Sequence, residues 1–184
     1  MDYYLDIQVH PDMEITTPAL LNNLFAKFHR AMNQYCAGKV AVSFPLYNTS
    51  LGNTLRLHGS QKDLEQLMIQ PWLKGLRDYT TVSAVMPVPA NIVGYRTIYR
   101  VQKKSPHNLR KRAVAKGRMT EQEALTKIPD SLQERLILPF IQIQSLSSQQ
   151  VMRIYVAQGN ILSEPVKGEL SSYGMSRTTT IPWF

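Results

Sequence analysis

Four histidines are the side chains of this sequence best suited to proton transfer near neutral pH, because an unperturbed imidazole has a pKa of roughly 6.5. His10, His58 and His107 fall at the end of an expected strand, inside a strand, and in the first turn of a basic helix, where surface or structural roles are common. His29 differs, because on a helical wheel it lies about 80° from the centre of the apolar stripe of its helix. An imidazole at that edge is reachable by solvent and can act as a general base, although many boundary histidines are structural.

Other templates of enzyme chemistry do not occur in the sequence. It has no His-Glu-x-x-His, Asp-rich loop or Cys/His cluster for a metal, no glycine-rich phosphate loop and no Gly-x-Ser-x-Gly elbow. Its one cysteine, Cys36, cannot form an internal disulfide. We therefore expect no metal and no cofactor. RNA cleavage is still a possible activity, because it needs no metal. A base that removes the 2′-hydroxyl proton lets that oxygen attack the adjacent phosphate.

The net charge of +8 is concentrated in the second half of the chain. Residues 1–95 carry seven basic and seven acidic side chains, whereas residues 96–184 carry fourteen and six. Residues 96–118 have no acidic side chain and nine basic ones: Arg96, Arg100, Lys103, Lys104, Arg110, Lys111, Arg112, Lys116 and Arg118. We call these nine side chains the basic cluster. Such an excess of one sign indicates a polyanionic partner, and a merely solvated helix surface is the simpler alternative.

A helix is expected over residues 106–117 of this segment, capped by Ser105 and begun by Pro106. Few of its residues are apolar, so it can add little to a core, and its cations are better explained by phosphate contacts. A basic helix can enter the major groove of RNA next to a loop or helix end. Arg100 and Gln102 share one face of the preceding strand and are candidates for base-specific contacts.

The first half predicts strands and helices in the order βαββαβ, which is that of a ferredoxin-like domain. Residues 3–9 alternate apolar and polar side chains, as a half-buried strand does. The other elements are a helix with Thr17 as its N-cap, strands at 41–44 and 54–58, a helix capped by Ser60 with Asp63, and a strand at 80–85.

The second half predicts a smaller α+β domain that begins after Pro87 and Pro89. Its elements are a strand at 95–102, the basic helix, a helix with the capping box Thr120 and Glu123, and strands at 136–144 and 151–156. The C-terminal residues are too irregular to assign. The predicted fold class is therefore α+β, with a ferredoxin-like domain at residues 1–90 and a basic domain at residues 91–184.

The composition is that of a folded globular chain. Of 184 residues, 43% are hydrophobic and 18% are charged, which allows a sizeable core. No apolar run approaches the roughly 20 residues of a membrane span, and Asp2 and Asp6 interrupt any signal peptide. A cytoplasmic protein without membrane contact is the expectation.

Several motifs in the same order resemble one family, the CRISPR RNA-processing endoribonucleases of type I-F systems. The resemblance covers almost the whole chain and depends on Met1–Ile7, Phe28–His29, Val42–Pro45, Gln70–Asp78, Arg100–Gln102, Ile128–Asp130, Leu138–Phe140 and Pro182–Phe184. It implies a ferredoxin-like domain followed by an RNA-binding domain whose arginine-rich helix enters the major groove of the CRISPR repeat hairpin. It also implies metal-free cleavage of precursor CRISPR RNA at the 3′ base of the stem, giving 5′-hydroxyl and 2′,3′-cyclic phosphate ends.

The resemblance further implies how the product is kept and which partners are present. The chain would act as a monomer, stay bound to the hairpin of the mature guide RNA, and contact other subunits of a type I-F interference complex. An alternative from another class is a non-catalytic subunit that binds the RNA hairpin, with His29 structural. A duplex DNA-binding protein is disfavoured, because the sequence has no helix-turn-helix or dimer signature.

Residue by residue, the resemblance assigns a catalytic role to His29. The family's serine matches Ser145, with Ser147 as second choice or a turn residue, and its tyrosine matches Tyr173. The base-reading pair matches Arg100 and Gln102, and the groove helix matches Arg110, Lys111, Arg112 and Lys116. Ala115 stands at a position that is basic in the family, and Met152 stands where an aromatic ring can stack under the last base pair of the stem.

Overall fold

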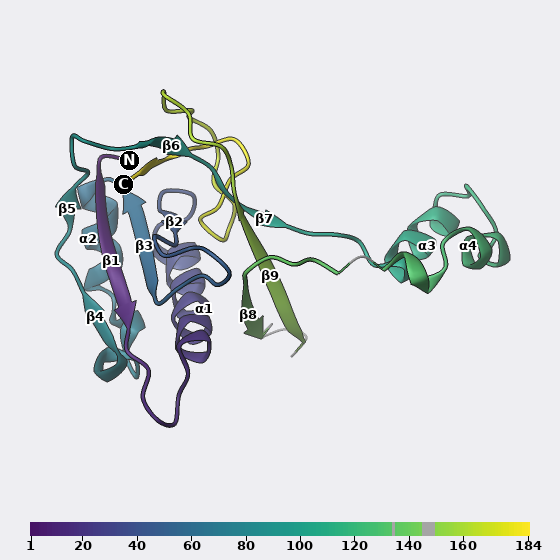
Figure 1. Ribbon diagram of the computed structural model, residues 1–184, viewed down its shortest axis with the longest axis horizontal. Helices are drawn as coiled ribbons and strands as arrows, with labels where there is room; N and C mark the ends of the chain where they lie inside the picture. Colours follow the sequence, from purple (N-terminus) through teal and green to yellow (C-terminus); the bar gives the residue numbers. More distant parts are fainter. Residues whose placement is uncertain (134, 145–149) are drawn as a thin grey trace. The chain divides into compact units, whose positions relative to one another are not determined.

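A computed structural model describes residues 1–133, 135–144 and 150–184 (Figure 1). Helices combine with antiparallel sheets, which confirms the predicted α+β class. The chain divides into two compact units: residues Met1–Arg100 with Leu138–Phe184, and residues Val101–Ile137. The domains predicted at 1–90 and 91–184 are a different division of the chain, and they stay a prediction.

The larger unit is built on a sheet with the strand order β2-β3-β1-β4. Its strands are β1 (Tyr3–Val9), β2 (Ala41–Ser43), β3 (Thr54–Gly59) and β4 (Thr80–Val82), and a short β5 (Met86–Pro87) also pairs with β1. Leu5, Ile7 and Val9 of β1 are fully buried, as their alternation predicts. Helices α1 (Thr17–Tyr35) and α2 (Gln61–Ile69) cover one face of the sheet (Figure 1).

Local sequence signals explain the ends of both helices. The N-cap of α1 is Thr16, so the prediction of Thr17 was wrong by one residue, because Pro18 is tolerated in either of the first two helical positions. The predicted cap of α2 is confirmed, since Ser60 Oγ accepts a hydrogen bond from Asp63 N. Helix α2 stops before Pro71, and the 3₁₀ helices η1 (Pro71–Leu73) and η2 (Arg77–Tyr79) lead to β4.

Two further sheets complete the larger unit. One pairs β6 (Gly94–Arg96) with β10 (Ile181–Trp183), and the other has the order β7-β9-β8, with β7 (Ile98–Val101), β8 (Phe140–Gln144) and β9 (Val151–Gln158). The single strand predicted at 95–102 is interrupted at Thr97, whose carbonyl accepts a hydrogen bond from Gly159 N. Ile141 and Ile143 of β8 are buried, and β8 packs against α1.

The smaller unit contains α3 (Pro106–Ala115), α4 (Glu121–Lys127) and the 3₁₀ helix η3 (Asp130–Leu132). Both predicted caps are confirmed: Ser105 Oγ accepts from Asn108 N, and Thr120 forms a capping box with Glu123. Among its described residues only Pro106 and Ala124 are buried, so this unit has little apolar core. Across the described ranges, no helix has the length and apolar character needed to traverse a bilayer.

Candidate functional site

His29 and Tyr173 stack on each other, although 143 residues separate them in the chain. Their ring centroids are 4.7 Å apart and their planes differ by 19°. His29 lies on α1 next to the buried Phe28 and is itself half-buried, which confirms its predicted place at the edge of the apolar face. Two residues to which the family resemblance assigns catalytic roles are therefore in contact.

The environment of His29 favours the neutral form of its imidazole. Burial lowers the pKa of His29 below its ordinary value of 6.5, and the nearby positive charge of Arg30 lowers it further. A histidine that removes a proton near neutral pH must start the reaction with one ring nitrogen unprotonated. The pKa direction is therefore the one that a general base needs.

The turn that carries Tyr173 is held to the edge of β2. Val42 N donates to Gly174 O at 2.9 Å, and Gly174 N donates to Ser171 O at 2.9 Å. Gly174 has φ +69°, and a Cβ on this residue would lie 2.9 Å from Val40 O. A side chain would strain the backbone there and clash with the carbonyl of Val40, just before β2. Glycine at this position is therefore what lets the turn dock and present the Tyr173 ring to His29.

Arg100 of β7 joins the same cluster. Its Cζ lies 5.2 Å from the centroid of the Tyr173 ring, which is a cation–π contact. Arg177 Nη2 donates to Arg100 O at 3.3 Å. Arg100 Nε is shielded from solvent and has no hydrogen-bond partner among the described residues. A buried donor without an acceptor is uncommon, and it marks Arg100 as a side chain whose contacts within the protein are incomplete.

The other predicted site residues have different positions. Ser145 and Ser147 lie outside the described residues. Met152 of β9 is half-buried and packs against the apolar core. Gln102 follows β7 and is exposed, as are Lys103 and Lys104.

The basic side chains on and just after α3, all predicted to contact RNA, differ in how exposed they are. Lys111 and Arg112 are exposed, and so are Lys116 and Arg118 just after the helix. Arg110 instead donates from Nη1 to Ile128 O and from Nη2 to Asp130 Oδ1, both at 2.7 Å, and its side chain is only 15% exposed. Arg110 therefore joins α3 to η3, a structural role that the sequence pattern did not indicate.

Within the described ranges, no three histidine, cysteine, aspartate or glutamate side chains come together in a way that could hold a metal ion. The cluster of His29, Tyr173 and Arg100 instead offers a neutral base, an aromatic ring and an unpaired cationic donor. These groups can take a proton and stabilise a negative charge, which is what attack on a phosphodiester by a neighbouring hydroxyl requires.

Comparison with known proteins identifies the family of the chain. The model of the CRISPR-associated protein family Cas_Csy4 matches residues 4–184. The chain belongs to the Cas_Csy4 family. It is 48% identical over 185 residues to the CRISPR-associated endonuclease Cas6/Csy4 of Escherichia coli (strain UTI89 / UPEC), with 100% of both chains covered. It is 38% identical over 190 residues to the protein of that name from Pseudomonas aeruginosa (strain UCBPP-PA14), again with 100% of both covered. The family predicted from the sequence motifs is confirmed.

Sequence reasoning missed one polar residue of this Cas_Csy4 site. Asn33 stands four residues after His29 on α1, and its side chain reaches the turn that carries Tyr173. The spacing was a usable signal, because residues four apart share one face of a helix. What the spacing could not reveal is the acceptor, since Ser172 is 139 residues away in sequence.

Proposed function

We propose that this chain is a metal-independent endoribonuclease that cuts precursor CRISPR RNA at the 3′ base of the repeat hairpin and stays bound to the mature guide RNA. The two relatives carry the name CRISPR-associated endonuclease and align over the full length of this chain. The observation that carries the proposal is the stack of His29 on Tyr173 beside Arg100, with the His29 pKa lowered. That cluster supplies a base and a cation without a metal.

In the proposed reaction, His29 removes the proton from a ribose 2′-hydroxyl. The 2′-oxygen attacks the adjacent phosphorus, the bond from phosphorus to the 5′-oxygen breaks, and that oxygen takes up a proton. The products are a 2′,3′-cyclic phosphate and a 5′-hydroxyl. Arg100 stabilises the negative charge that develops on the phosphate, and Tyr173 orients the imidazole. Ser145 holds the ribose in the attacking geometry, with Ser147 as the second choice.

The RNA grip is assigned to Gln102, Met152 and the basic cluster except Arg96, whose guanidinium donates to Gly159 O and Gln158 Oε1. Arg100 and Gln102 read bases near the foot of the stem, where Met152 covers the last base pair. The exposed Lys111, Arg112, Lys116 and Arg118 contact phosphates of the hairpin, with Lys103 and Lys104 nearby in sequence. Because Arg110 is held by Ile128 and Asp130, we expect it to shape this surface more than to bind phosphate.

The remaining parts of the proposal concern fold and assembly. We assign a ferredoxin-like arrangement to the first domain, supported by the strand order β2-β3-β1-β4 with both helices on one face. We further propose that the protein works in the cytoplasm, binds RNA as a monomer, and contacts other subunits of a type I-F interference complex.

One cleavage assay tests the reaction. Labelled repeat hairpin RNA is incubated with the wild-type chain in EDTA, and the product ends are analysed. We expect a 2′,3′-cyclic phosphate, and no cleavage of a hairpin whose cut-site nucleotide is 2′-deoxy. His29→Ala should bind the hairpin as wild type does without cutting it, whereas His10→Ala, which removes an exposed histidine bonded to Thr81, should cut normally. Hairpin binding without any cleavage by the wild type would instead favour a non-catalytic RNA-binding subunit.

A salt titration tests the grip. Replacing Arg112 and Lys116 by alanine should weaken hairpin binding and reduce the slope of log Kd against log salt by about 2, one unit for each lost phosphate contact. Replacing Lys62 and Lys167, two exposed lysines outside the basic cluster, is the matched control and should leave the slope unchanged. Equal slopes for both double variants would remove α3 from the RNA interface.

A further inference from the structure

The Asn33 side chain links helix α1 to the turn that carries Tyr173. Its Nδ2 donates to His29 O at 2.6 Å and to Ser172 O at 2.9 Å. One amide therefore uses both of its hydrogens to join the carbonyl of the proposed base to the carbonyl just before the stacking tyrosine. No other hydrogen bond between described residues joins α1 to residues 171–175.

The remaining contacts of this turn hold it from other directions. Gly174 O accepts from Val42 N next to β2, and Ser176 N donates to Ile98 O of β7 at 2.8 Å. Ser171 N and Oγ both donate to Met175 O inside the turn. These bonds tie the turn to the two neighbouring strands, but none of them ties it to the helix that carries His29. Among the described residues, Asn33 therefore provides the hydrogen bond that ties this turn to the helix of His29.

We propose that Asn33 is a positioning residue that holds the Tyr173 ring against the His29 imidazole and so fixes the direction in which the imidazole faces the substrate. The inference rests on the proposed function of His29. Asn33 itself touches no reacting atom. It acts through Tyr173, because its hydrogen bond to Ser172 O keeps the turn close to α1.

A purely structural role for Asn33 in α1 fits the chemistry less well. Asparagine is a weak helix former, and an amide that bonds to the carbonyl four residues earlier competes with the helix backbone. Alanine would serve the helix better at this exposed position. The bond to His29 O does, however, fix the Asn33 rotamer so that the second amide hydrogen points at Ser172 O. The side chain therefore suits the contact with the turn better than it suits the helix.

Single-turnover cleavage at saturating enzyme tests the proposal. Asn33→Ala should lower the rate about 5- to 10-fold, the factor expected from one hydrogen bond, while Kd for a 2′-deoxy hairpin and the urea midpoint stay near wild type. The matched control is Asn23→Ala, which removes an exposed asparagine from the same helix and should change nothing. In a Tyr173→Ala background, Asn33→Ala should add no further loss, because the residue acts through that ring.

A second readout needs no RNA. Because burial is the main cause of the lowered His29 pKa, loosening the Tyr173 ring should raise that pKa toward 6.5 in Asn33→Ala, as followed by NMR of the free protein. Arg30 and Arg100 are retained in both variants, so their charges do not differ between them. The titration in Asn23→Ala should match wild type.

The outcomes separate this inference from the proposed function. If wild type cuts the hairpin and Asn33→Ala cuts it equally fast, the positioning role is wrong. It is also wrong if rate, affinity and urea midpoint all fall together, since that pattern means a general structural role. If wild type does not cut at all, the proposed function fails, and the His29 titration then decides: an unchanged pKa in Asn33→Ala overturns the positioning role as well.

Discussion

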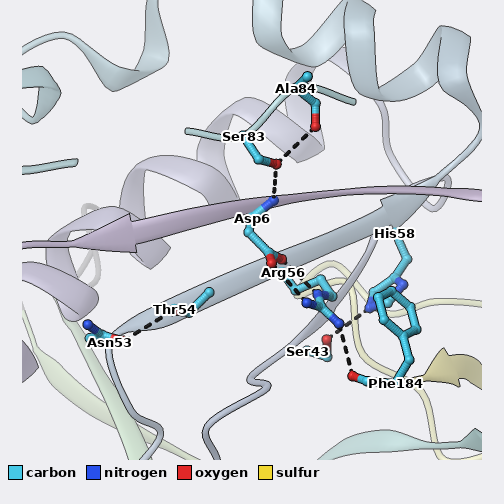
Figure 2. Close-up of polar contacts among 9 residues, drawn as sticks. All are labelled: Asp6, Ser43, Asn53, Thr54, Arg56, His58, Ser83, Ala84 and Phe184. Carbon is cyan, nitrogen blue, oxygen red and sulfur yellow. Dashed lines mark hydrogen bonds and ion pairs between the residues drawn. The ribbon is translucent and has the colours of Figure 1, made fainter. Parts of the chain in front are cut away.

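Two histidines of the larger unit have lowered pKa values and only one can exchange protons with a bound substrate. His29 is half-buried on α1 and stacks on Tyr173. His58 on β3 is fully buried, and its Nε2 lies 2.8 Å from Ser43 Oγ (Figure 2). Burial, with a smaller contribution from Arg56, lowers the pKa of His58 to about 3. A lowered pKa thus marks a candidate base only where a substrate can reach the ring.

The arginine next to His58 is fully paired within the protein. Arg56 pairs with both carboxylate oxygens of Asp6, at 2.7 and 2.8 Å, and Nη1 donates to Phe184 O at 3.1 Å (Figure 2). Its guanidinium also lies over the rings of Phe184 and Tyr4, at 4.2 and 4.8 Å. The arginine of the other site differs, because Arg100 Nε has no acceptor among the described residues. Arg56 is therefore committed to contacts within the fold, whereas Arg100 lies over Tyr173 beside His29.

The internal chemistry of His58 explains why it resists protonation. Its Nδ1 is buried and has no hydrogen-bond partner among the described residues. A protonated imidazole would place a donor there without an acceptor, in addition to burying a charge beside Arg56. The neutral ring avoids both of these costs while Nε2 keeps its contact with Ser43 Oγ.

The largest expected difference between the two histidines comes from exchanging each for alanine. His29→Ala should lower the cleavage rate by roughly 10²- to 10⁴-fold, the usual contribution of a general base, and barely change the urea midpoint. His58→Ala should lower the free energy of unfolding by about 3 kcal/mol, because it leaves a cavity and an unpaired Ser43 hydroxyl, yet its folded molecules should cut at the wild-type rate. Loss of cleavage in folded His58→Ala would break the distinction.

The next effect is on acid stability. Folded His58 stays neutral down to about pH 3, whereas the unfolded chain takes up a proton on this residue below about 6.5. The free energy of unfolding should therefore fall as the pH falls from 6.5, by up to about 1.4 kcal/mol per pH unit from His58 alone. The double variant Ser43→Ala/His58→Leu removes both partners and should show a shallower dependence. Urea unfolding at pH 7, 5.5 and 4.5 measures it, and parallel curves for the two proteins would contradict the role of His58.

Local sequence signals account for much of the fold. The caps at Ser60 and Thr120 were predictable because each bonds to a residue three positions away. The apolar stripe of α1 also placed His29 at the edge of the buried face, because helix geometry alone sets that position. Where all the interacting groups lie within one turn of a helix, the amino-acid sequence is enough to predict the local structure.

Partners distant in sequence explain what could not be predicted. Strand β10 has three residues and exists because β6 pairs with it, about 85 residues earlier in the chain. Arg110 looked like any other cation of its helix, but Asp130, 20 residues on, gives it a structural contact. Tyr173 was proposed from the family resemblance alone, since no helix or strand pattern could bring its ring to His29.

A smaller effect tests whether Arg56 stabilises the buried surroundings of His58. Arg56→Met keeps an apolar stem over Phe184 but leaves the Asp6 carboxylate without its bidentate partner. We expect the free energy of unfolding to fall by about 2 kcal/mol, since both side chains are largely shielded from solvent. Cleavage by the folded protein should not change. Urea unfolding measures the loss. A stability equal to wild type would show that the contacts of Arg56 add nothing to the free energy of unfolding.

The smallest effect concerns the pKa of His29 and the exposed charge of Arg30 beside it. Arg30 disfavours a second positive charge on His29, so Arg30→Gln should raise the pKa of His29 and move the acid limb of the rate against pH to slightly higher pH. Rates should then be lower than wild type on the acid limb and equal to it on the alkaline plateau. Because Arg30 is exposed, salt should screen the effect, and the two profiles should merge at high ionic strength. Lys62→Gln, which removes an exposed charge from α2, is the control and should follow wild type throughout. If Arg30→Gln left the acid limb in place at low salt, burial alone would set the His29 pKa. His29 would then differ from His58 only in its access to substrate.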